Sequence, residues 1–214
     1  MSTRGYDNSR RTEAARLTRA RILAAAREQF LGVGYHGTTI AALARAAEVS
    51  PQTIYNTIGG KAEVLKAVYD VLLAGDDEPI AMNQRPEMAR VRTQPDASST
   101  LRAYAAFARL LLERTGPLLG AVLAEGAGSD AELSAFLATI DTERRIGNTG
   151  VVRHIAERFG LGDGVSPDRA VDLVWTLTAP ENADRLVRRC RWSFDDYERW
   201  LSDALAAGLP ALAR

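Results

Sequence analysis

The sequence has few of the residues on which catalysis and metal binding usually depend. Among 214 residues there are one cysteine, Cys190, and two histidines, His36 and His154. A single cysteine excludes an intramolecular disulfide and any zinc site with several cysteine ligands. Neither histidine lies in a metal-ligand spacing or a nucleophile motif, and the glycines at 32–34 follow a helical segment, whereas a phosphate-binding loop follows a strand. The sequence therefore predicts neither an enzyme nor a metal or cofactor site.

Long apolar runs are also missing. No stretch of roughly 18 apolar residues is present to cross a membrane, and the first twenty residues lack the apolar core of a signal peptide. The hydrophobic residues, 46% of the chain, are nevertheless enough to bury a substantial core. We therefore expect a folded, cytoplasmic protein without a membrane partner.

The net charge is zero, but the charges are unevenly distributed. Residues 1–75 contain ten Lys and Arg against six Asp and Glu, whereas residues 76–214 contain seventeen against twenty-one. Because a positive field attracts an anion locally, the basic first third is the part expected to approach phosphates. Arginines at positions 4, 10, 11, 16 and 19 precede or open the first helical segment, where they form either a DNA-contacting arm or a solvated tail.

Strand-like alternation is absent, and apolar residues recur instead at spacings of three and four, which predicts an all-α fold. Residues 75–98, rich in Pro, Asp, Arg and Gln, predict an irregular connector, and Pro180 is expected to interrupt one of the later helices. The expected helices are 12–31, a short one after Thr39, one beginning at Ser50-Pro51, one from about Lys61, and then 99–115, 117–126, 130–159, 167–189 and 194–207.

Residues 39–55 predict a helix-turn-helix, in which two short helices are joined by a tight turn. Ala44 is small enough for a close helix crossing, Val49 is placed to fill the corner, and Ile54 is placed to anchor the second helix from below. The opposite side of that helix would then present amides and hydroxyls that can contact bases and phosphates. A helical hairpin whose polar face is merely solvated would produce the same pattern.

The stretch 21–68 closely resembles the DNA-binding domain of the TetR family of transcriptional regulators. The resemblance is carried by Ala25, Phe30, Gly34-Tyr35, Thr38-Thr39, Ile40, Leu43, Ala44, Val49-Ser50, Thr53, Tyr55 and Lys61. It implies that Thr39, Tyr55 and Lys61 contact phosphates and that Gln52, Thr53 and Asn56 face bases. The full set of DNA contacts expected from it is Thr38, Thr39, Ser50, Pro51, Gln52, Thr53, Tyr55, Asn56 and Lys61.

The sequence departs from the family pattern at three places. Glu48 stands where the family usually has a glycine in the turn, at a position whose backbone is less comfortable for a residue with a Cβ. Ile58 replaces a usual aromatic residue, and Gly59-Gly60 replaces polar capping residues. These departures concern local geometry, although the charge of Glu48 near the second helix is expected to weaken DNA binding.

The last helix, beginning near Trp192, looks like that of a TetR subgroup, and family precedent places two C-terminal helices in a dimer interface. We therefore expect the helices near 167–179 and 194–207 to pair two copies of the chain. The expected interface residues are Val171, Val174, Trp175, Trp200, Leu201 and Leu205. Ordinary packing within one chain explains the same spacing.

The remaining helices are expected to enclose an effector. Two stripes at helical spacing follow each other along the chain, one formed by Tyr104, Phe107 and Leu111 and the other by Phe136, Ile140 and Glu143. A polar run at 141–148 could place hydrogen-bonding groups inside a cavity. Plain core packing and a solvated polar face remain the alternatives. The expected ligand-binding residues are Tyr104, Phe107, Leu111, Phe136, Ile140, Glu143 and His154.

These features predict an N-terminal three-helix helix-turn-helix DNA-binding domain and a C-terminal helical ligand-binding and dimerisation domain. The expected limits are 1–15 for a flexible basic arm, 16–74 for the DNA-binding domain, 75–98 for the connector and 99–214 for the second domain. The expected function is a homodimeric, sequence-specific repressor that binds a palindromic operator in double-stranded DNA and is released by a small-molecule effector. The alternative is an all-helical protein-interaction module without a specific DNA target.

Overall fold

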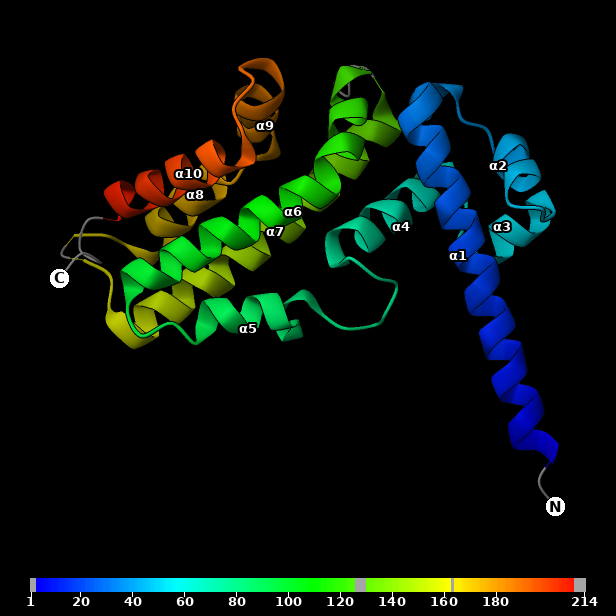
Figure 1. The fold of residues 1–214 in the computed structure, drawn as a ribbon, viewed down its shortest axis with the longest axis horizontal. Coiled ribbons are helices and arrows are strands. Elements are labelled where there is room, and N and C mark those ends of the chain that lie inside the picture. Colours follow the sequence, from blue (N-terminus) through cyan, green and yellow to red (C-terminus); the bar gives the residue numbers. More distant parts are fainter. Residues whose placement is uncertain (1–2, 126–129, 163, 210–214) are drawn as a thin grey trace. The chain divides into compact units, whose positions relative to one another are not determined.

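The computed structural model describes residues 3–125, 130–162 and 164–209, with the backbone alone for 3–10. Every regular element in this part of the chain is a helix, which confirms the all-α prediction (Figure 1). The elements are α1 (Thr3–Gly37), α2 (Ile40–Ala46), α3 (Pro51–Thr57), α4 (Lys61–Ala74), η1 (Met82–Gln84), α5 (Pro86–Arg92), α6 (Ala97–Ala124), α7 (Ala131–Phe159), α8 (Pro167–Leu177), α9 (Pro180–Ala183), η2 (Asp184–Arg189) and α10 (Phe194–Gly208). Among these helices, none is both long and apolar enough to cross a membrane.

The chain divides into two compact units. Unit 1 consists of Met1–Asp77 and Pro117–Phe136, and unit 2 consists of Glu78–Gly116 and Leu137–Arg214. The sequence predicts 99–214 as a single domain, whereas the structure groups residues 117–136 with the N-terminal helices. The difference arises because α6 and α7 each contribute residues to both units, and helical periodicity does not reveal where along a helix the packing partner changes.

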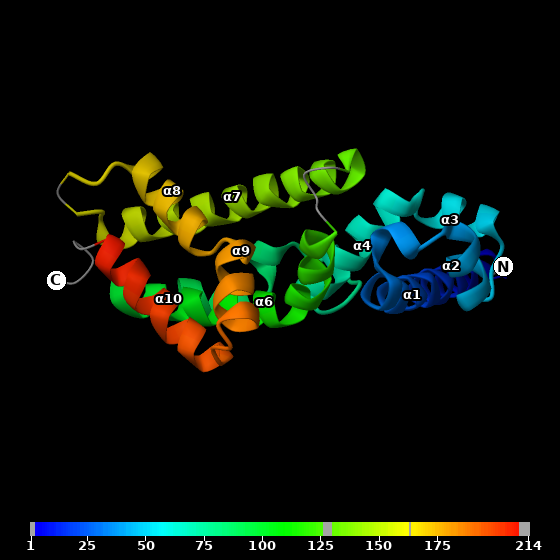
Figure 2. The same cartoon turned by 90° about the horizontal axis from the view of Figure 1, so that it is seen from above.

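In unit 1, α1 packs against α2 and α4, and α2 packs against α3 (Figure 2). The apolar residues of α1 that face this core are Ile22, Leu23, Ala26 and Phe30, all buried. Leu17, which precedes them on the same helix, is 54% exposed because it lies nearer the free end of the helix. The helix also begins at Thr3, so most of the stretch expected as a flexible arm is helical; Met1 and Ser2 lie outside the described residues.

Two side-chain caps fix the starts of α2 and α3, which lie where the sequence predicts these helices to begin. The Thr39 hydroxyl accepts a hydrogen bond from the N–H of Ala42 at the start of α2. The Ser50 hydroxyl accepts one from the N–H of Thr53, and Pro51 occupies the first turn of α3, where its missing N–H costs nothing. Such caps contribute about 1 kcal/mol each to helix stability.

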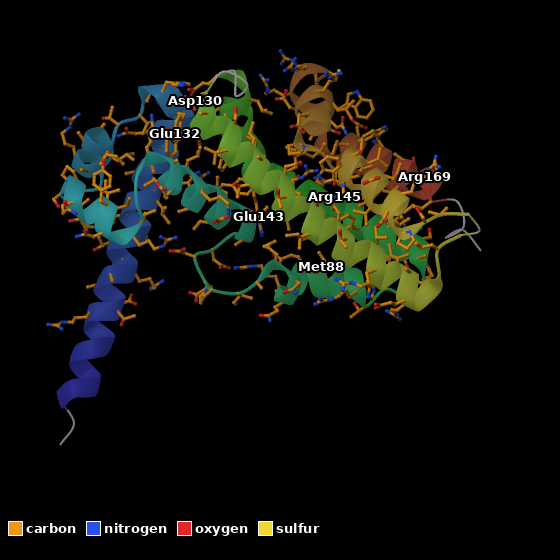
Figure 3. All side chains as sticks on the ribbon, turned by 180° about the vertical axis from the view of Figure 1, so that it is seen from behind. Met88, Asp130, Glu132, Glu143, Arg145 and Arg169 are labelled. Atoms are coloured by element: carbon orange, nitrogen blue, oxygen red, sulfur yellow. The ribbon has the colours of Figure 1, made fainter. Side chains whose placement is uncertain are left out.

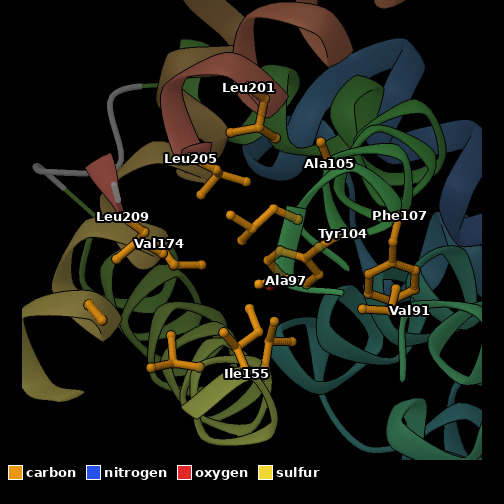
Figure 4. Close-up of a cluster of buried hydrophobic side chains, with 14 of the residues drawn as sticks. Val91, Ala97, Tyr104, Ala105, Phe107, Ile155, Val174, Leu201, Leu205 and Leu209 are labelled. Atoms are coloured by element: carbon orange, nitrogen blue, oxygen red, sulfur yellow. The ribbon is translucent and has the colours of Figure 1, made fainter. Parts of the chain in front are cut away.

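Unit 2 has its own hydrophobic core, drawn in Figure 4. Apolar side chains from α5, α6, α7, α8 and α10 meet there, and α8 and α10 pack against each other. The fully buried members include Leu101, Ala105, Ile155, Val174, Leu201 and Leu205.

Two proline positions behave differently from each other. Gly116-Pro117, expected to end a helix, lies inside the continuous helix α6. Pro117 removes one backbone hydrogen bond, a loss of about 3 kcal/mol, but the adjacent Leu118 and Leu119 are buried and together offset it. Pro180 ends the regular helix as expected, because α8 stops at Leu177 and a short α9 and a π-helical segment, η2, follow.

The burial in unit 2 corrects most of the expected dimer interface. Val171, Val174, Leu201 and Leu205 are buried in the core of a single chain, so they are not available to a partner. Only Trp175 and Trp200 of the expected set retain partial exposure. The physical reason is that α8 and α10 cover α6 and α7 with their most apolar faces, and sequence periodicity does not distinguish such a face from an intermolecular one.

We predict that Leu201→Ala will lower the free energy of unfolding by about 2–5 kcal/mol, because it removes a fully buried side chain and leaves a cavity. Denaturant unfolding of the full chain measures this change. Ala206→Gly, at an exposed position of the same helix, is the control and should cost about 1 kcal/mol. Equal losses in the two variants would show that Leu201 does not pack in the core.

Candidate nucleic-acid interface

The turn between α2 and α3 has the geometry of a helix-turn-helix corner. Glu48 has a left-handed backbone (φ 53°), as expected from its place at a usual glycine position, and this costs a non-glycine residue about 1 kcal/mol. The N–H of Val49 donates to the carbonyl of Ala44 at 2.9 Å, which closes the turn. Ala44 itself is buried, consistent with a close approach of the two helices.

Helix α3 has one buried side and one exposed side. Ile54 is fully buried and anchors the helix to unit 1. Gln52, Tyr55 and Asn56 are exposed, Tyr55 with 52% of its surface. This division leaves a row of amide and hydroxyl groups facing solvent, which is the arrangement that a recognition helix requires.

Other residues of the expected DNA-contact set lie around this helix. Thr39, Ser50 and Pro51 are exposed, and Thr53 is partly exposed with its hydroxyl 2.8 Å from that of Ser50. Thr38 is the exception, since it is only 1% exposed and its hydroxyl donates to the carbonyl of Gly34 at 2.7 Å. Thr38 therefore holds the chain that leads into α2 and cannot contact DNA.

Lys61 begins α4 and lies over the ring of Tyr35. Its Nζ atom is 4.0 Å from the ring centroid and donates to the carbonyl of Tyr35 at 3.2 Å. The cation–π contact and the hydrogen bond hold the ammonium group in place. A phosphate contact by Lys61, which the resemblance implies, would use its remaining N–H donors.

Unit 1 also contains a polar junction that the sequence does not predict. Helix α1 is broken at Gly34 (φ 75°, ψ −179°), and the next two N–H groups, of Tyr35 and His36, both donate to the carboxylate of Glu125. A Cβ at position 34 would overlap that carboxylate, so the position requires glycine on two grounds. We call Gly34, Tyr35, His36, Glu125, Asp130 and Glu132 the α1 junction.

The side chains of the α1 junction complete the contact. The ring of His36 bonds to Glu125 through Nδ1 and to Asp130 through Nε2, the latter at 2.8 Å. The hydroxyl of Tyr35 donates to Glu132. Figure 3 labels Asp130 and Glu132 at the N-terminal end of α7. No sequence signal indicates these pairs, because about ninety residues separate their members.

The junction shifts the pKa values of His36, Glu125, Asp130 and Tyr35. Hydrogen bonds to Asp130 and Glu125 raise the pKa of His36 above its ordinary value of 6.5. Burial acts to raise the pKa of Glu125, but hydrogen bonds from His36 and Tyr35 hold it below its ordinary range. The pKa of Asp130 is lowered by the backbone N–H of Leu133 and by His36, and burial followed by the bond to Glu132 raises the pKa of Tyr35.

Two arginines near the start of the chain are already paired with carboxylates in unit 1. Arg16 pairs with Glu13 at 2.9 Å, and Arg19 pairs with Asp77 at 3.0 Å. Both pairs are at least partly exposed, where ion pairs contribute little to stability. They nevertheless reduce the positive charge that this end of α1 offers to phosphates.

The residues expected to bind an effector do not form one group. Phe136 belongs to unit 1, where its ring contacts that of Tyr69 edge to face, so it does not join the others. Glu143 is exposed, Leu111 is partly buried, and Phe107 and Ile140 are buried. The stripe containing Phe136 and Ile140 is split because unit 1 ends within α7.

A polar network lies inside unit 2 beside Tyr104. The hydroxyl of Tyr104 donates to the buried amide of Asn148, and burial raises the pKa of this hydroxyl. Arg144 donates to the carbonyl of Trp175 at 3.0 Å and to Asp141 at 2.8 Å. The Nε2 atom of His154 is buried without a hydrogen-bond partner within the described part of the chain.

Within residues 3–125, 130–162 and 164–209, no three His, Cys, Asp or Glu side chains are placed to hold an ion. What the described surface does offer is a short helix with an exposed polar face, set on a buried anchor after a tight turn. The fold and this surface define a helix-turn-helix DNA-binding protein.

Comparison with known proteins agrees with this class. Residues 22–68 match the sequence model of the tetR family of bacterial regulatory proteins. No curated protein matches the sequence. Residues 22–68 thus form a DNA-binding domain of the TetR type, and the chain is a DNA-binding transcriptional regulator.

Solved structures similar to this chain show the same fold over most of its length. A TetR-family transcriptional regulator from Syntrophomonas wolfei has a TM-score of 0.71 at 13% identity, covering 92% of this chain and 97% of its own. The fatty acid degradation regulator FadR from Bacillus halodurans has a TM-score of 0.64 at 15% identity, with 87% and 93% covered. Salmonella enterica GusR has a TM-score of 0.62 at 19% identity, with 90% and 95% covered.

We predict that the stability contributed by the α1 junction is greatest within a window of pH and is lost on both sides of it. A raised folded-state pKa means that the contribution of His36 is complete below 6.5 and is lost as the pH rises through the folded value. Glu125 and Asp130, with lowered pKa values, contribute above 4.5 and 3.8 and lose their contribution as the pH falls through their folded values. The junction should therefore be most stable between about pH 4.5 and 6.5.

An NMR titration of the His36 ring measures its folded-state pKa, which determines where this stability is lost as the pH rises. The variant His36→Asn identifies the signal of this ring. Asp130→Asn should move the pKa of His36 down toward 6.5, and Asp70→Asn, at a carboxylate of α4 paired with Lys66, should leave it unchanged. A His36 pKa that is the same with and without Asp130 would contradict the contact.

Proposed function

We propose that two copies of this chain bind a palindromic DNA operator and repress the genes beside it. The observation that carries the proposal is the exposed polar face of α3, which Ile54 anchors to unit 1. One short helix reads few base pairs, and a dimer that spaces two such helices by roughly 34–36 Å reads successive major-groove faces. The proposed contacts are Thr39, Ser50, Pro51, Gln52, Thr53, Tyr55, Asn56 and Lys61.

We further propose that a small molecule bound in unit 2 releases the operator. The polar network around Tyr104 and Asn148, with the unpartnered Nε2 of His154 in the same unit, supplies the few polar groups that such a site needs within an apolar core. The ligand would favour a conformation in which the two recognition helices are wrongly spaced, and DNA would lower the ligand's affinity by the same factor. A ligand of unit 2 that leaves DNA affinity unchanged would contradict this mechanism.

The proposal assigns the chain no catalytic activity. It places the dimer contact on the outward sides of α8 and α10, where Trp175 and Trp200 retain partial exposure after the core is filled. Gly208 supports a close approach of these two helices within one chain, because a Cβ there would overlap the side chain of Leu173. The same pair of helices would then face its copy with a surface of tryptophan and small residues.

We predict that Tyr55→Ala will abolish a palindromic footprint. Loss of a hydrogen bond to a phosphate should weaken binding roughly ten- to hundredfold. Genome fragments are selected with the purified full-length protein at about 150 mM salt, and the enriched site is footprinted with both proteins. Trp192→Ala, at an exposed aromatic residue of unit 2, is the matched control and should bind normally. If the wild type enriches no site, the protein-interaction alternative gains support.

We predict that Ala204→Arg will convert the dimer to a monomer, because a buried, unpaired charge in a protein interface costs several kcal/mol. Ala204 lies one turn after Trp200 on α10, on the same side of the helix. Sedimentation velocity measures the oligomeric state. Ala206→Arg introduces the same side chain at an exposed position about 200° around the helix from Ala204 and should remain dimeric. A dimeric Ala204→Arg variant would place the interface elsewhere.

A further inference from the structure

The two amide side chains on the exposed face of α3 are hydrogen-bonded to each other. Gln52 and Asn56 lie one turn apart, and Nε2 of Gln52 donates to Oδ1 of Asn56 at 2.9 Å. Both residues are exposed, and neither side chain has another hydrogen-bond partner within the described part of the chain. The pair therefore points into solvent as a single group rather than as two independent side chains.

The free atoms of this pair form a defined pattern of donors and acceptors. An amide has one carbonyl oxygen and two N–H donors, and one hydrogen bond between two amides uses one carbonyl and one N–H. The carbonyl oxygen of Gln52, its second N–H and both N–H groups of Asn56 remain available. The pattern is the same whichever amide donates, because one carbonyl oxygen and several N–H groups always stay free.

This pattern complements one base edge in the major groove. Adenine presents a donor at N6 and an acceptor at N7, whereas guanine presents acceptors at both O6 and N7. Guanine would accept hydrogen bonds from the N–H groups of the pair but would offer no donor to its free carbonyl, so the two-point match would be lost. The usual readers of guanine are Arg and Lys, and α3, with the sequence PQTIYNT, contains neither.

The neighbouring residues of α3 are less suited than the amide pair to form hydrogen bonds with a base edge. The hydroxyl of Thr53 is already 2.8 Å from that of Ser50, and Ile54 is buried. Tyr55 presents a hydroxyl, which matches a phosphate as well as a base. Because the Gln52–Asn56 bond also restrains two flexible side chains before DNA arrives, less rotamer entropy is lost on binding.

We propose that Gln52 and Asn56 act together as one reader of an A·T base pair in each operator half-site. The inference rests on the proposed function and deepens it, because it names the base that the recognition helix selects. The pair's N–H donates to adenine N7 while its free carbonyl accepts from adenine N6. Replacing this A·T pair by G·C should weaken binding roughly 5- to 150-fold.

The test uses sites selected from a random duplex library by the full-length protein, followed by titration of the selected operator. Gln52→Ala, Asn56→Ala and the double variant should each lose the preference for A·T at the same position. The double variant should lose little more than either single one, because each substitution already destroys the shared group. Replacing the read adenine by 7-deazaadenine, which lacks N7, should weaken wild-type binding roughly two- to tenfold and leave the Asn56→Ala variant unaffected.

Tyr55→Phe is the comparison on the same helix. Loss of a phosphate contact lowers affinity for all sequences by a similar factor and does not alter base preference. The inference is overturned if the positions sensitive to Gln52 and Asn56 are G·C, or if the two single variants change different positions and their losses add. A library that yields no palindrome with the wild-type protein overturns the proposed function itself, and this inference with it.

Discussion

The carboxylate of Glu125 is the group on which the arrangement of unit 1 depends. Where α1 breaks at Gly34, two backbone N–H groups lose their helical acceptors, and unpaired buried N–H groups are costly. Glu125 accepts from both, and the bend that results brings the ring of Tyr35 beneath Lys61. The chain then continues through the buried Thr38 to the cap of α2. A glutamate from the end of α6 thus defines how the helix-turn-helix begins.

The exposed face of α3 follows from the same packing. Ile54 and Ala44 take the buried positions on either side of the turn, so the polar residues of α3 have no alternative to solvent. Hydrogen bonds between neighbours then order that face, one between Gln52 and Asn56 and one between Ser50 and Thr53. The surface offered to DNA is therefore arranged before binding, which reduces the entropy lost when the complex forms.

Local signals were sufficient to predict the helix-turn-helix, because caps, prolines, small residues and apolar spacing all act within a few residues. The caps Thr39 and Ser50 and the left-handed Glu48 illustrate this. The α1 junction was not predictable, since Tyr35 and Glu132 meet across about ninety residues. The burial of Leu201 within one chain was not predictable for a related reason, because an apolar helix face has the same spacing whether its own chain or a partner covers it.

The charges of unit 1 suggest how affinity and specificity are divided. Arg16 and Arg19 are paired with carboxylates, Lys61 is held by Tyr35, and α3 carries no cation. Phosphate neutralisation supplies most of the non-specific affinity of DNA-binding proteins, and each contact adds about 0.9 to the logarithmic salt dependence. Because α3 itself carries no cation, the helix that faces the bases adds nothing to this non-specific affinity. Hydrogen bonds to bases and the pairing of two copies must then supply a larger share of operator affinity, which favours selectivity over tight non-specific binding.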